Sequence, residues 1–489
     1  MRSYDTLYIG GSWTPSSDDA RIEVISPHTE RVIATVPDCT PADMDRAVAA
    51  ARAAADRSGW PTTSVAERLA LLERLAVVYE QRLPEMAEVV SAEMGSPISF
   101  SQVGQAGAAL VILRAMIAVG RSFEVTEQRS GMLNPTVTIR REPVGVVGAI
   151  VPWNVPQIVT MAKLAPALVA GCTVVLKCAP ESPLDAFLLF EMLDEVGFPP
   201  GVVNLVPGGR EVGAHLVRHP DVDKIAFTGS TAAGRAIAAV CGETLKRCSL
   251  ELGGKSAAVV LDDADMSSLP VGLKFASMIN SGQACTNQTR IFASRKRYAE
   301  VVEAVVTMLN TMKVGDPSDP ATEIGPMVSE RQQQRVEKYI ALGQEEGAKL
   351  AFGGTGRPPG LSTGWYVRPT VFADATNEMR ISQEEIFGPV LSVIPYADEE
   401  EAIALANASE YGLAASVWTS DTAHGAEVAA RLRSGTVGIN NYSAEFLAPF
   451  GGYKCSGIGR EFGREGLEEY VELKTVFPSP PELSASPFR

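Results

Sequence analysis

Short apolar runs divided by glycine and proline constrain the fold of this chain more than any other feature. Between residues 144 and 227 they alternate with helical patterns at 184–196 and 210–218, and the runs themselves are 144–150, 173–176, 202–206 and 224–227. Such alternation is typical of parallel strands in βαβ units, with both faces of the sheet covered. A second series begins near Leu252, with a strand at 257–261 and helices at 298–311, 329–347 and 400–407. We therefore predict an α/β chain of at least two domains, because single cores stop growing at roughly 250–300 residues.

Other stretches flank these α/β units. Residues 41–125 have the Ala-rich amphipathic pattern and the capping signals of helices, and we interpret them as scaffold. Residues 128–143 alternate polar and apolar side chains and 468–477 contain β-branched residues, so the two segments are predicted to pair as an exposed arm. Such an arm is a candidate for dimerisation, and an edge hairpin is an equally good interpretation. The Pro- and Ser-rich tail 478–489 is expected to be mobile.

The charge balance argues against two classes of partner. The formal net charge is −15, so a nucleic-acid backbone or an anionic membrane would be repelled at long range. The N-terminus lacks the pattern of a signal peptide. The most apolar stretch, 164–176, is interrupted by Pro166 and is shorter than the roughly 20 residues that span a bilayer. We expect neither export nor a transmembrane helix.

The cysteines and histidines argue against disulfides and metals. Seven cysteines form an odd set without a Cys-x-x-Cys pair, which fits free thiols in a reducing compartment and a cytoplasmic location. His215 and His219 are four residues apart and could share a helix face, but no glutamate follows His215, so a solvated helix is the better interpretation. No metal site is expected.

Cys285 and Glu251 are the strongest candidates for chemistry. Cys285 lies in the segment NSGQACT (280–286), and Glu251 begins ELGGK (251–255). A thiol can act as the nucleophile and a carboxylate as the base of a two-step acyl reaction. A cysteine protease would use a histidine instead, but none of the four histidines lies within sixty residues of Cys285. The carboxylate is therefore the better partner for the thiol.

Several turns could bind a ligand, although each has an ordinary structural explanation when taken alone. The strand-to-helix turn 227–234 (FTGSTAAG) could hold a pyrophosphate at a helix N-terminus, although its spacing is not GxGxxG. Asn154 follows a strand and could donate to an anionic oxygen, and Lys177 ends a strand at the edge where ligands of open α/β sheets bind. The segment EIFGP (385–389) combines a carboxylate with an aromatic ring, which suits a ribose and a flat heterocycle. Phe450, in a glycine-dense loop, could form the wall of an apolar pocket.

Taken together and in order, these motifs resemble those of the aldehyde dehydrogenase superfamily. The resemblance covers nearly the full chain and rests on PWN at 152–154, Lys177, GST at 229–231 with Gly234, ELGG at 251–254, GQxC at 282–285, EIFGP at 385–389 and PFGG at 449–452. It implies a Rossmann-like cofactor domain, a second α/β catalytic domain and a small β oligomerisation arm. The implied bounds are 1–124 with 144–251 for the dinucleotide-binding domain, 252–455 for the catalytic domain, and 125–143 with 465–489 for the arm and tail.

The resemblance also implies a mechanism. Cys285 would attack the aldehyde carbon, and the Asn154 side chain would hold the oxyanion together with the Cys285 backbone N–H. Hydride would pass to NAD(P), and Glu251 would deprotonate the water that hydrolyses the thioester. Relatives that transfer the acyl group to coenzyme A lack this base, so Glu251 favours hydrolysis to the free acid. Lys163 matches a family lysine near the active site, and Glu461 matches a glutamate proposed to relay protons.

The implied cofactor site has one departure from the family pattern. Lys177 and Glu385 match residues that bind the two riboses, and Phe387 matches a ring beside the nicotinamide. The other matching positions of the dinucleotide cleft are Trp153, Gly229, Ser230, Gly234 and Leu252. Pro180 stands where NAD-preferring members commonly have a glutamate, which would repel a 2′-phosphate. Because the neighbouring Glu181 can partly replace this carboxylate, NAD is the expected cofactor and NADP is expected to be tolerated.

The segments expected to surround the substrate are largely apolar. Their candidate pocket residues are Ile158, Met161, Ala284, Thr286, Phe446 and Phe450. These segments contain no basic residue that could anchor a carboxylate of the substrate, which argues against dicarboxylic semialdehydes. We therefore expect an uncharged, hydrophobic aldehyde of aliphatic, aromatic or terpenoid type. The expected assembly is a homodimer or homotetramer.

Three other functions compete with this interpretation. An acyl hydrolase would use the thiol without a cofactor, which leaves Lys177, Gly229 and Glu385 unexplained. The presence of both Cys285 and Glu251 argues against a noncatalytic structural or binding protein. The nearest rival is a dehydrogenase that transfers the acyl group to coenzyme A, and the presence of Glu251 argues against it.

Overall fold

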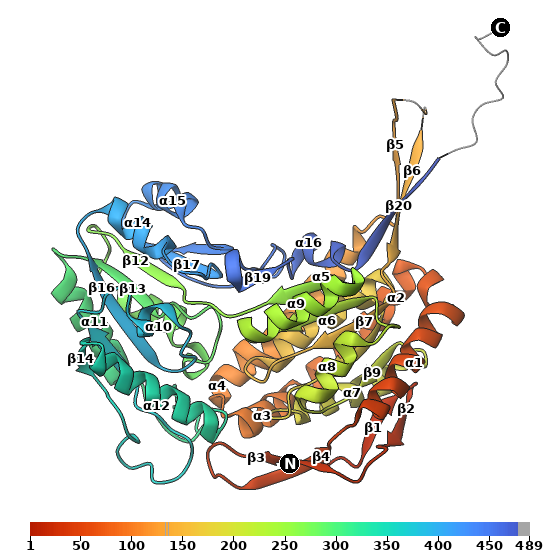
Figure 1. Ribbon diagram of the computed structural model, residues 1–489, viewed down its shortest axis with the longest axis horizontal. Coiled ribbons are helices and arrows are strands. Elements are labelled where there is room, and N and C mark those ends of the chain that lie inside the picture. The colour runs from red at the N-terminus through yellow and green to blue at the C-terminus, as the bar shows by residue number, and fades with distance from the viewer. Residues whose placement is uncertain (133, 135, 478–489) are drawn as a thin grey trace.

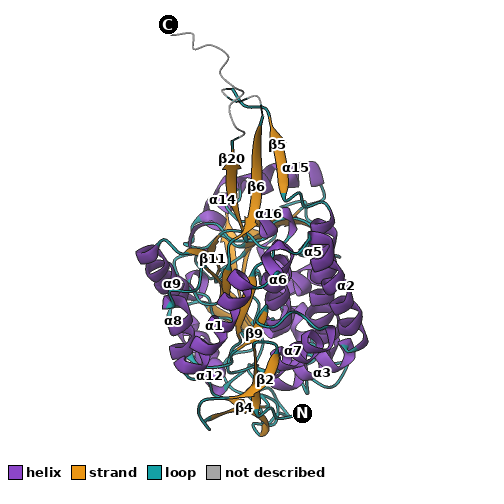
Figure 2. Ribbon diagram, turned by 90° about the vertical axis from the view of Figure 1, so that its right-hand side faces the viewer, coloured by secondary structure: helices purple, strands orange, loops and turns teal. Residues whose placement is uncertain are grey.

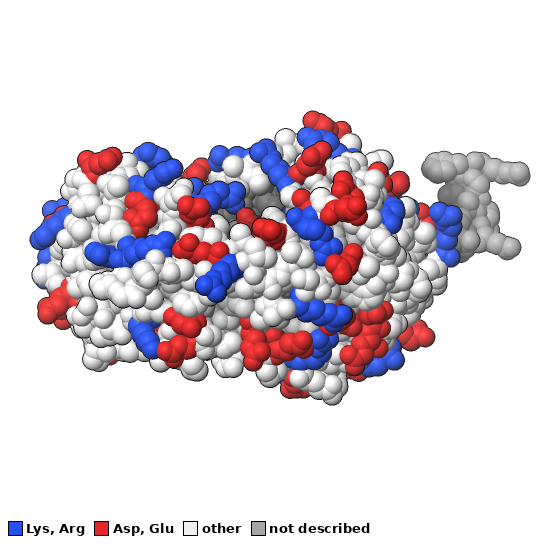
Figure 3. All heavy atoms as spheres, turned by 90° about the horizontal axis from the view of Figure 1, so that it is seen from below, with Lys and Arg blue, Asp and Glu red and all other residues white. Residues whose placement is uncertain are grey.

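The computed structural model describes residues 1–132, 134 and 136–477, so the 478–489 tail, with its expected mobility, lies outside the described residues. Two large sheets form the centres of two lobes, and a smaller sheet projects from one lobe as an arm (Figure 1). The architecture is α/β, as the apolar runs predict. On the face seen from below, acidic and basic side chains are interspersed (Figure 3).

The first lobe contains an eight-stranded sheet in the order β19-β11-β10-β7-β8-β9-β1-β2. Its strands are β1 (Thr6–Ile9), β2 (Ser12–Pro15), β7 (Val146–Ile150), β8 (Thr173–Lys177), β9 (Val203–Leu205), β10 (Lys224–Thr228), β11 (Arg247–Glu251) and β19 (Gly457–Ile458). Strands β7 to β11 are parallel, with β8 and β9 on one side of β7 and with β10 and β11 on the other. The chain order therefore reverses between β7 and β10, and ligands of open α/β sheets bind beyond the strand ends at this switch point.

Helices cover both faces of this sheet. They are α1 (Pro41–Arg57), η1 (Trp60–Thr62), α2 (Val65–Gln81), α3 (Leu83–Met94), α4 (Ile98–Phe100), the π-helix η2 (Ser101–Gly107), α5 (Ala108–Arg121), α6 (Pro156–Ala170), α7 (Leu184–Val196), α8 (Arg210–Arg218) and α9 (Thr231–Thr244). Along β7, Val147 and Ala149 join the core beneath α2, α5 and α6, whereas Val146 and Ile150 join the core beneath α1 and α8. Figure 2 shows α8 and α9 on one side of the strands and α2, α5 and α6 on the other. Burial on both faces explains why these strands are uninterrupted apolar runs.

The second lobe repeats this layering around a seven-stranded sheet in the order β14-β15-β16-β13-β12-β17-β18. The strands are β12 (Ala257–Val260), β13 (Arg290–Ser294), β14 (Lys349–Phe352), β15 (Thr370–Ala373), β16 (Val390–Tyr396), β17 (Ala414–Trp418) and β18 (Thr436–Ile439). The helices and turns are α10 (Leu269–Ser277), η3 (Ile279–Gly282), α11 (Tyr298–Thr311), α12 (Glu330–Glu345), α13 (Arg380–Gln383), α14 (Glu399–Asn407), α15 (Thr422–Arg431) and η4 (Lys454–Ser456), whereas α16 (Gly463–Glu468) returns to the first lobe and packs on α5 and α6. Only β14 runs antiparallel to its neighbour among the described strands of this sheet.

The arm is a three-stranded antiparallel sheet of β5 (Thr126–Arg129), β6 (Val137–Pro143) and β20 (Val471–Val476). The predicted pairing of 128–143 with 468–477 is confirmed, since β20 runs beside β6 over its full length. Leu473, Val476 and Phe477 are exposed on it. A separate hairpin of β3 (Arg21–Ile25) and β4 (Val32–Pro37) lies near the N-terminus.

One long helical segment has the length and apolar composition of a membrane span. Ile98–Arg121 is long and apolar enough, by length and composition, to cross a membrane. Half of its most apolar window is buried, and α5 packs against α2 and α6 within the core of the first lobe. The sequence pattern indicates only 164–176 as a span candidate, because the glycines of η2 interrupt the apolar pattern of the longer segment.

Candidate active site

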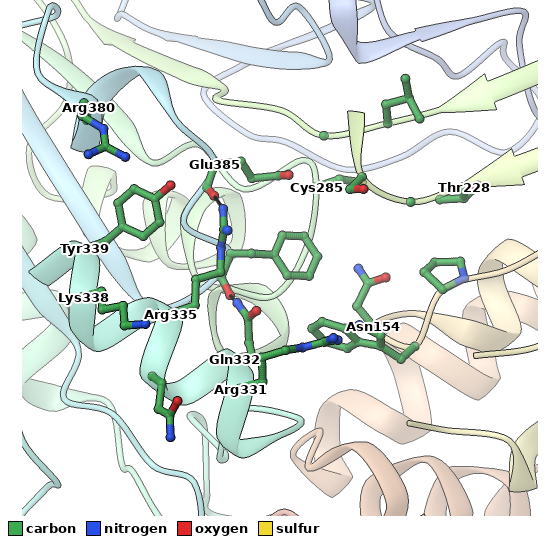
Figure 4. A pocket seen from close by; sticks show the side chains of 18 of the residues that line it. Asn154, Thr228, Cys285, Arg331, Gln332, Arg335, Lys338, Tyr339, Arg380 and Glu385 are labelled. Carbon is green, nitrogen blue, oxygen red and sulfur yellow. Dashed lines mark hydrogen bonds between the residues drawn. The ribbon is translucent and has the colours of Figure 1, made fainter. Parts of the chain in front are cut away.

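A cleft of about 940 Å³ opens between the lobes at the switch point of the first sheet. This volume lies within the roughly 300–1,000 Å³ typical of ligand pockets. Figure 4 shows residues of both lobes converging on it, with Asn154 and Thr228 from the first and Cys285, Gln332 and Glu385 from the second.

The turn before Cys285 has an unusual backbone. Asn280, Ser281 and Gly282 have φ values of 53°, 59° and 78°, so three successive residues are left-handed. A Cβ at Gly282 would lie 2.3 Å from the Gly388 carbonyl carbon. Non-glycine residues adopt this conformation only where the surroundings enforce it, and such strain clusters at functional sites. The turn delivers Cys285 to the cleft.

Asn154 faces Cys285 from the end of the loop after β7. Its Nδ2 donates to the Gln283 carbonyl at 2.9 Å, and Asn154 and Cys285 both line the cleft. Because an amide nitrogen carries two N–H groups, this bond orients the amide and leaves a second donor for a ligand. Burial and the nearby carboxylates of Glu385 and Glu251 raise the pKa of the Cys285 thiol to about 12. The thiol is therefore neutral near neutral pH and must lose its proton to a base when it attacks.

Glu251 ends β11 and is buried, with 4% of its surface exposed. Neither carboxylate oxygen has a hydrogen-bond partner within the described part of the chain. Burial, and secondarily the charge of Glu461, raise the pKa of Glu251 well above its usual value. A carboxylate with free oxygens and a raised pKa is suited to accept a proton near neutral pH.

Lys163 and Glu461 form a buried pair beside this base. The Lys163 ammonium contacts the Glu461 carboxylate and donates to Thr228 Oγ1 at 2.6 Å. The ammonium lowers the pKa of Glu251, and Glu461 raises it. The pair thus connects α6, the end of β10 and the segment after β19, and it sets the charge around Glu251.

The turn after β10 and the segment after α13 supply the other predicted binding residues of the cleft. Ser230, which lines the cleft with Gly229, caps α9 by accepting from the Ala233 N–H at 3.3 Å. The first N–H groups of a helix have no partner within the helix, so the start of α9 offers donors beside these two residues. Glu385 accepts from the Gly254 N–H at 3.0 Å, and burial raises its pKa to about 7. The Phe387 ring packs edge-on against Trp153 with centroids 5.4 Å apart.

Comparison with known proteins identifies the architecture. The aldehyde dehydrogenase family model matches residues 13–476. The chain belongs to the aldehyde dehydrogenase family. Among curated relatives, it is 46% identical to the geranial dehydrogenase of Castellaniella defragrans, over 96% of this chain and 98% of that protein. It is 43% identical to a 3-succinoylsemialdehyde-pyridine dehydrogenase of Pseudomonas sp, over 97% and 99% of the two chains.

Solved structures agree with this assignment. An NAD⁺ complex of a Mycobacterium tuberculosis aldehyde dehydrogenase matches with a TM-score of 0.96 and 48% identity, covering 98% of each chain. A mutant aldehyde dehydrogenase C of Pseudomonas syringae, in complex with NAD⁺ and octanal, matches with a TM-score of 0.94 and 43% identity over 97% and 96% of the chains. The resemblance deduced from the motifs and the predicted fold class are confirmed, and the protein is an enzyme of the NAD(P)-dependent aldehyde dehydrogenase class.

Within this aldehyde dehydrogenase, three predicted cofactor residues do not line the cleft. Lys177 is buried at the end of β8, where burial lowers the pKa of its ammonium. Gly234 lies in α9 beneath Leu252, which does line the cleft. Pro180 is half-buried, and the adjacent Glu181 forms an ion pair with Arg331 of α12 at 3.0 Å. The carboxylate of Glu181 is therefore already engaged across the cleft.

The predicted substrate residues lie outside the lining of this cleft. Ala284 and Thr286 flank Cys285, Ile158 is half-buried on α6, and Met161 is fully buried in the main core. The Phe446 and Phe450 rings both pack against Phe462, with centroids 5.1 Å and 5.6 Å away. A substrate role for these six positions stays a prediction.

Sequence reasoning missed the contribution of α12 to the cleft. Gln332 Nε2 donates to the Phe387 carbonyl at 2.7 Å, and Arg335 Nη2 donates to the Glu385 carbonyl at 2.5 Å. Arg331 and Lys338 lie on the same helical face and also line the cleft. Their three- and four-residue spacing was visible in the sequence, but a charged row of this kind is also typical of a solvated helix. In the described ranges, no group of three or more His, Cys, Asp or Glu side chains could hold a metal ion.

Proposed function

We propose that this aldehyde dehydrogenase oxidises an uncharged, hydrophobic aldehyde to the free acid through a covalent thioester on Cys285. The observation that carries the proposal is the shared cleft wall of Cys285 and Asn154, in which the Asn154 amide is held by Gln283 and retains a free N–H. A nucleophile beside a fixed amide donor is the arrangement that attack on a carbonyl requires.

In the acylation half, the Cys285 sulfur bonds to the aldehyde carbon and its proton passes to a base. We assign the role of this base to Glu251, because its charge affects the pKa of Cys285 and its carboxylate oxygens have no hydrogen-bond partner within the described structure. The carbonyl oxygen becomes an oxyanion, which the free N–H of Asn154 and the backbone N–H of Cys285 stabilise. Bound NAD(P) supplies the acceptor for the hydride that leaves this carbon.

In the deacylation half, Glu251 first releases the thiol proton to solvent, and it then takes a proton from the water that attacks the Cys285 thioester. The carbon–sulfur bond breaks, the acid leaves, and the proton passes from Glu251 to the sulfur, which restores the thiol. The buried, unpaired carboxylate supports this assignment, because a base already engaged by strong donors would have a lowered proton affinity. A coenzyme A-acylating enzyme would not need such a base.

The cleft fits a dinucleotide at the switch point. The capped N-terminus of α9 offers N–H groups to a pyrophosphate, and Gly229 and Ser230 keep the backbone accessible there. Glu385 would accept from ribose hydroxyls, and Phe387 with Trp153 would pack on the nicotinamide side. Lys177, at the end of β8, would bind the second ribose. These residues form a cradle of donors, one carboxylate and aromatic surface, as the chemistry of NAD(P) requires.

We propose NAD as the main cofactor, with NADP tolerated. Pro180 removes the carboxylate that would repel a 2′-phosphate. Glu181 is a weaker substitute, because its carboxylate already forms an ion pair with Arg331 at 3.0 Å. The NAD⁺ complexes of the two similar solved structures support NAD as the first cofactor to test.

The substrate class is supported by the apolar side chains of Val155 and Val159, which line the cleft with Cys285, and by the names of related proteins. One curated relative is named for geranial, and one similar structure contains octanal, whereas another relative is named for a semialdehyde of pyridine. We propose an aliphatic, aromatic or terpenoid aldehyde. The exposed apolar side chains of β20 support self-association as a homodimer or homotetramer through the arm, and seven free thiols suit a cytoplasmic location.

The test is spectrophotometric. The purified protein is incubated with NAD or NADP and a panel of aliphatic, aromatic, terpenoid and semialdehyde substrates, and formation of the reduced cofactor is followed without coenzyme A. Turnover with the uncharged aldehydes is expected, and Cys285→Ala should abolish it. Asn154→Ala should lower the rate by about 10²–10³-fold. Activity that requires coenzyme A would overturn the hydrolytic mechanism, and turnover restricted to charged semialdehydes would overturn the substrate class.

A further inference from the structure

Two buried side-chain amides hold the main-chain carbonyl of Asn154. Gln105 Nε2 donates to this oxygen at 2.9 Å, and Asn280 Nδ2 donates to it at 2.7 Å. Gln105 is completely buried, and 2% of Asn280 is exposed. Asn280 belongs to the left-handed turn that delivers Cys285, whereas Gln105 comes from a helical region far away in the sequence.

Gln105 reaches Asn154 from the π-helical segment η2 between α4 and α5. A π-helix adds a residue to the turn and so changes which side chains face inward, and such segments are frequent at functional sites. Two glycines make the local packing possible: a Cβ at Gly104 would lie 2.1 Å from the Phe100 ring, and one at Gly107 would lie 2.6 Å from the Gln102 carbonyl oxygen. In this setting Val103 is 76% exposed while Gln105 points into the protein.

A contribution to the stability of the fold does not explain why a glutamine is buried at position 105. Its Oε1 is buried without a hydrogen-bond partner in the described structure, and a buried unpaired acceptor destabilises a fold. The Gln105 amide nitrogen donates to the Asn154 carbonyl and, in a longer contact of 3.6 Å, to Met94 Sδ. An apolar side chain of similar volume would fill the same space without the unpaired oxygen.

We propose that Gln105 is a positioning residue that fixes the Asn154 side chain for stabilisation of the oxyanion. The inference rests on the proposed role of Asn154. Gln105 and Asn280 hold the peptide that follows Asn154, and Gln283 holds the tip of its side chain, so the remaining N–H has a fixed direction. Because a displacement of about 1 Å can lower a rate by up to about 10²-fold, loss of one anchor should slow acylation without abolishing it.

The first test replaces Gln105 by methionine, which retains the volume and removes the donor. The matched control is Gln288→Met, because Gln288 is also fully buried but bonds Ser416 in the second lobe. We expect the first-turnover rate of cofactor reduction to fall about 10-fold in Gln105→Met, with the dissociation constant of the cofactor unchanged within about twofold. The control should keep its first-turnover rate. An unchanged rate in Gln105→Met would overturn the proposal.

The second test is a double-mutant cycle with Asn154→Ala. If Gln105 acts through the Asn154 side chain, Gln105→Met should cause no further loss once that side chain is absent. Equal losses in both backgrounds would reject the positioning role even though Asn154 itself matters. An Asn154→Ala loss of less than about threefold would instead reject the oxyanion role on which the inference rests.

Gln105→Glu keeps the test decisive if the methionine variant does not fold. A protonated carboxyl group can donate to the Asn154 carbonyl, whereas an ionised one cannot. The first-turnover rate of this variant, relative to the wild type, should therefore fall as the pH rises. A ratio that does not change with pH would contradict the inference.

Discussion

The carboxylate of Glu251 lies directly against the backbone of Gly451. A Cβ at Gly451 would come within 2.7 Å of Glu251 Oε1, and the φ of this glycine is +154°. The absence of a side chain at Gly451 thus provides the room in which a buried carboxylate can stay without a hydrogen-bond partner. Burial contributes most to the raised pKa of Glu251, and the neighbouring Glu461 and Lys163 shift this pKa in opposite directions.

This arrangement predicts how deacylation depends on pH. In its proposed role, Glu251 acts as a base only when it is ionised. Because its pKa is raised, chiefly by burial, the deacylation rate should rise with pH through that raised pKa. Lys163→Met removes a positive charge that lowers the pKa of Glu251, so the rise should shift to higher pH. The decay of a preformed acyl-enzyme, followed by mass spectrometry, measures the rate.

Glu251→Gln is the control for this prediction. Its preformed acyl-enzyme should decay more slowly than that of the wild type, and the pH-dependent rise should disappear because the base is absent. Unchanged steady-state turnover in Glu251→Gln would remove the assigned role. A Lys163→Met profile identical to that of the wild type would show that the lysine does not tune the base.

Pro180→Glu should sharpen the preference for NAD. The new carboxylate would repel a 2′-phosphate, so kcat/KM with NADP should fall by about 10-fold or more while kcat/KM with NAD is retained. Pro180→Gln, which lacks the charge, should leave the ratio close to that of the wild type. If both variants changed the ratio equally, the effect would come from the loss of proline and not from charge.

Much of the fold was predictable because burial on both faces leaves a clear pattern. The helices predicted at 184–196, 210–218 and 298–311 coincide with α7, α8 and α11, and the strand predicted at 144–150 corresponds to β7. In these segments the apolar period and the flanking glycines or prolines agree with the tertiary environment. Local and global preferences therefore point to the same structure.

Site residues could be predicted from the sequence only where they belong to a recognisable motif. The motifs predict Cys285 and Asn154 as site residues, and both line the cleft, whereas the pattern around Gln105 predicts only helical scaffold. Nothing in its local pattern indicates that a π-helical turn directs it to the carbonyl of a residue 49 positions away. Arg331 and Arg335 were missed for a similar reason, since a charged helix face that meets a cleft has the same spacing as one that meets water.

Gly234→Ala should weaken cofactor binding. A Cβ there would lie 2.5 Å from Leu252 Cδ2, so Leu252 would be pushed towards the cleft that it lines. Because the end of a leucine side chain can move, we expect a moderate rise in the KM for NAD, on the order of fivefold, and little change in kcat. Gly242→Ala on the same helix has open space around its Cβ and serves as the control. An unchanged KM in Gly234→Ala would show that Leu252 does not bear on the cofactor.

A buried carboxyl pair predicts a pH dependence of stability. Glu93 accepts from the N–H groups of Leu184 and Asp185 at 2.8 Å and 3.0 Å, and Asp185 accepts from Gln157 at 2.6 Å. Burial raises the pKa of Asp185 to about 7, and burial together with the charge of Asp185 raises that of Glu93. The folded pair therefore holds a proton that the unfolded chain releases near pH 4.

The sign follows from this proton balance. Where the folded state binds more protons than the unfolded state, the free energy of unfolding decreases as the pH rises, by at most about 1.4 kcal/mol per pH unit for one proton. This contribution to stability is full below the unfolded pKa and is lost as the pH rises from about 4 to about 7.

Two variants test this prediction. Asp185→Asn removes the titrating carboxyl and supplies an amide N–H to Glu93, so its melting temperature should fall less between these pH values than that of the wild type. Glu93→Gln, which replaces the carboxyl group that accepts from two helix N–H groups, should instead lower the melting temperature. A steeper pH dependence in Asp185→Asn than in the wild type would show that the pair is ionised in the folded protein.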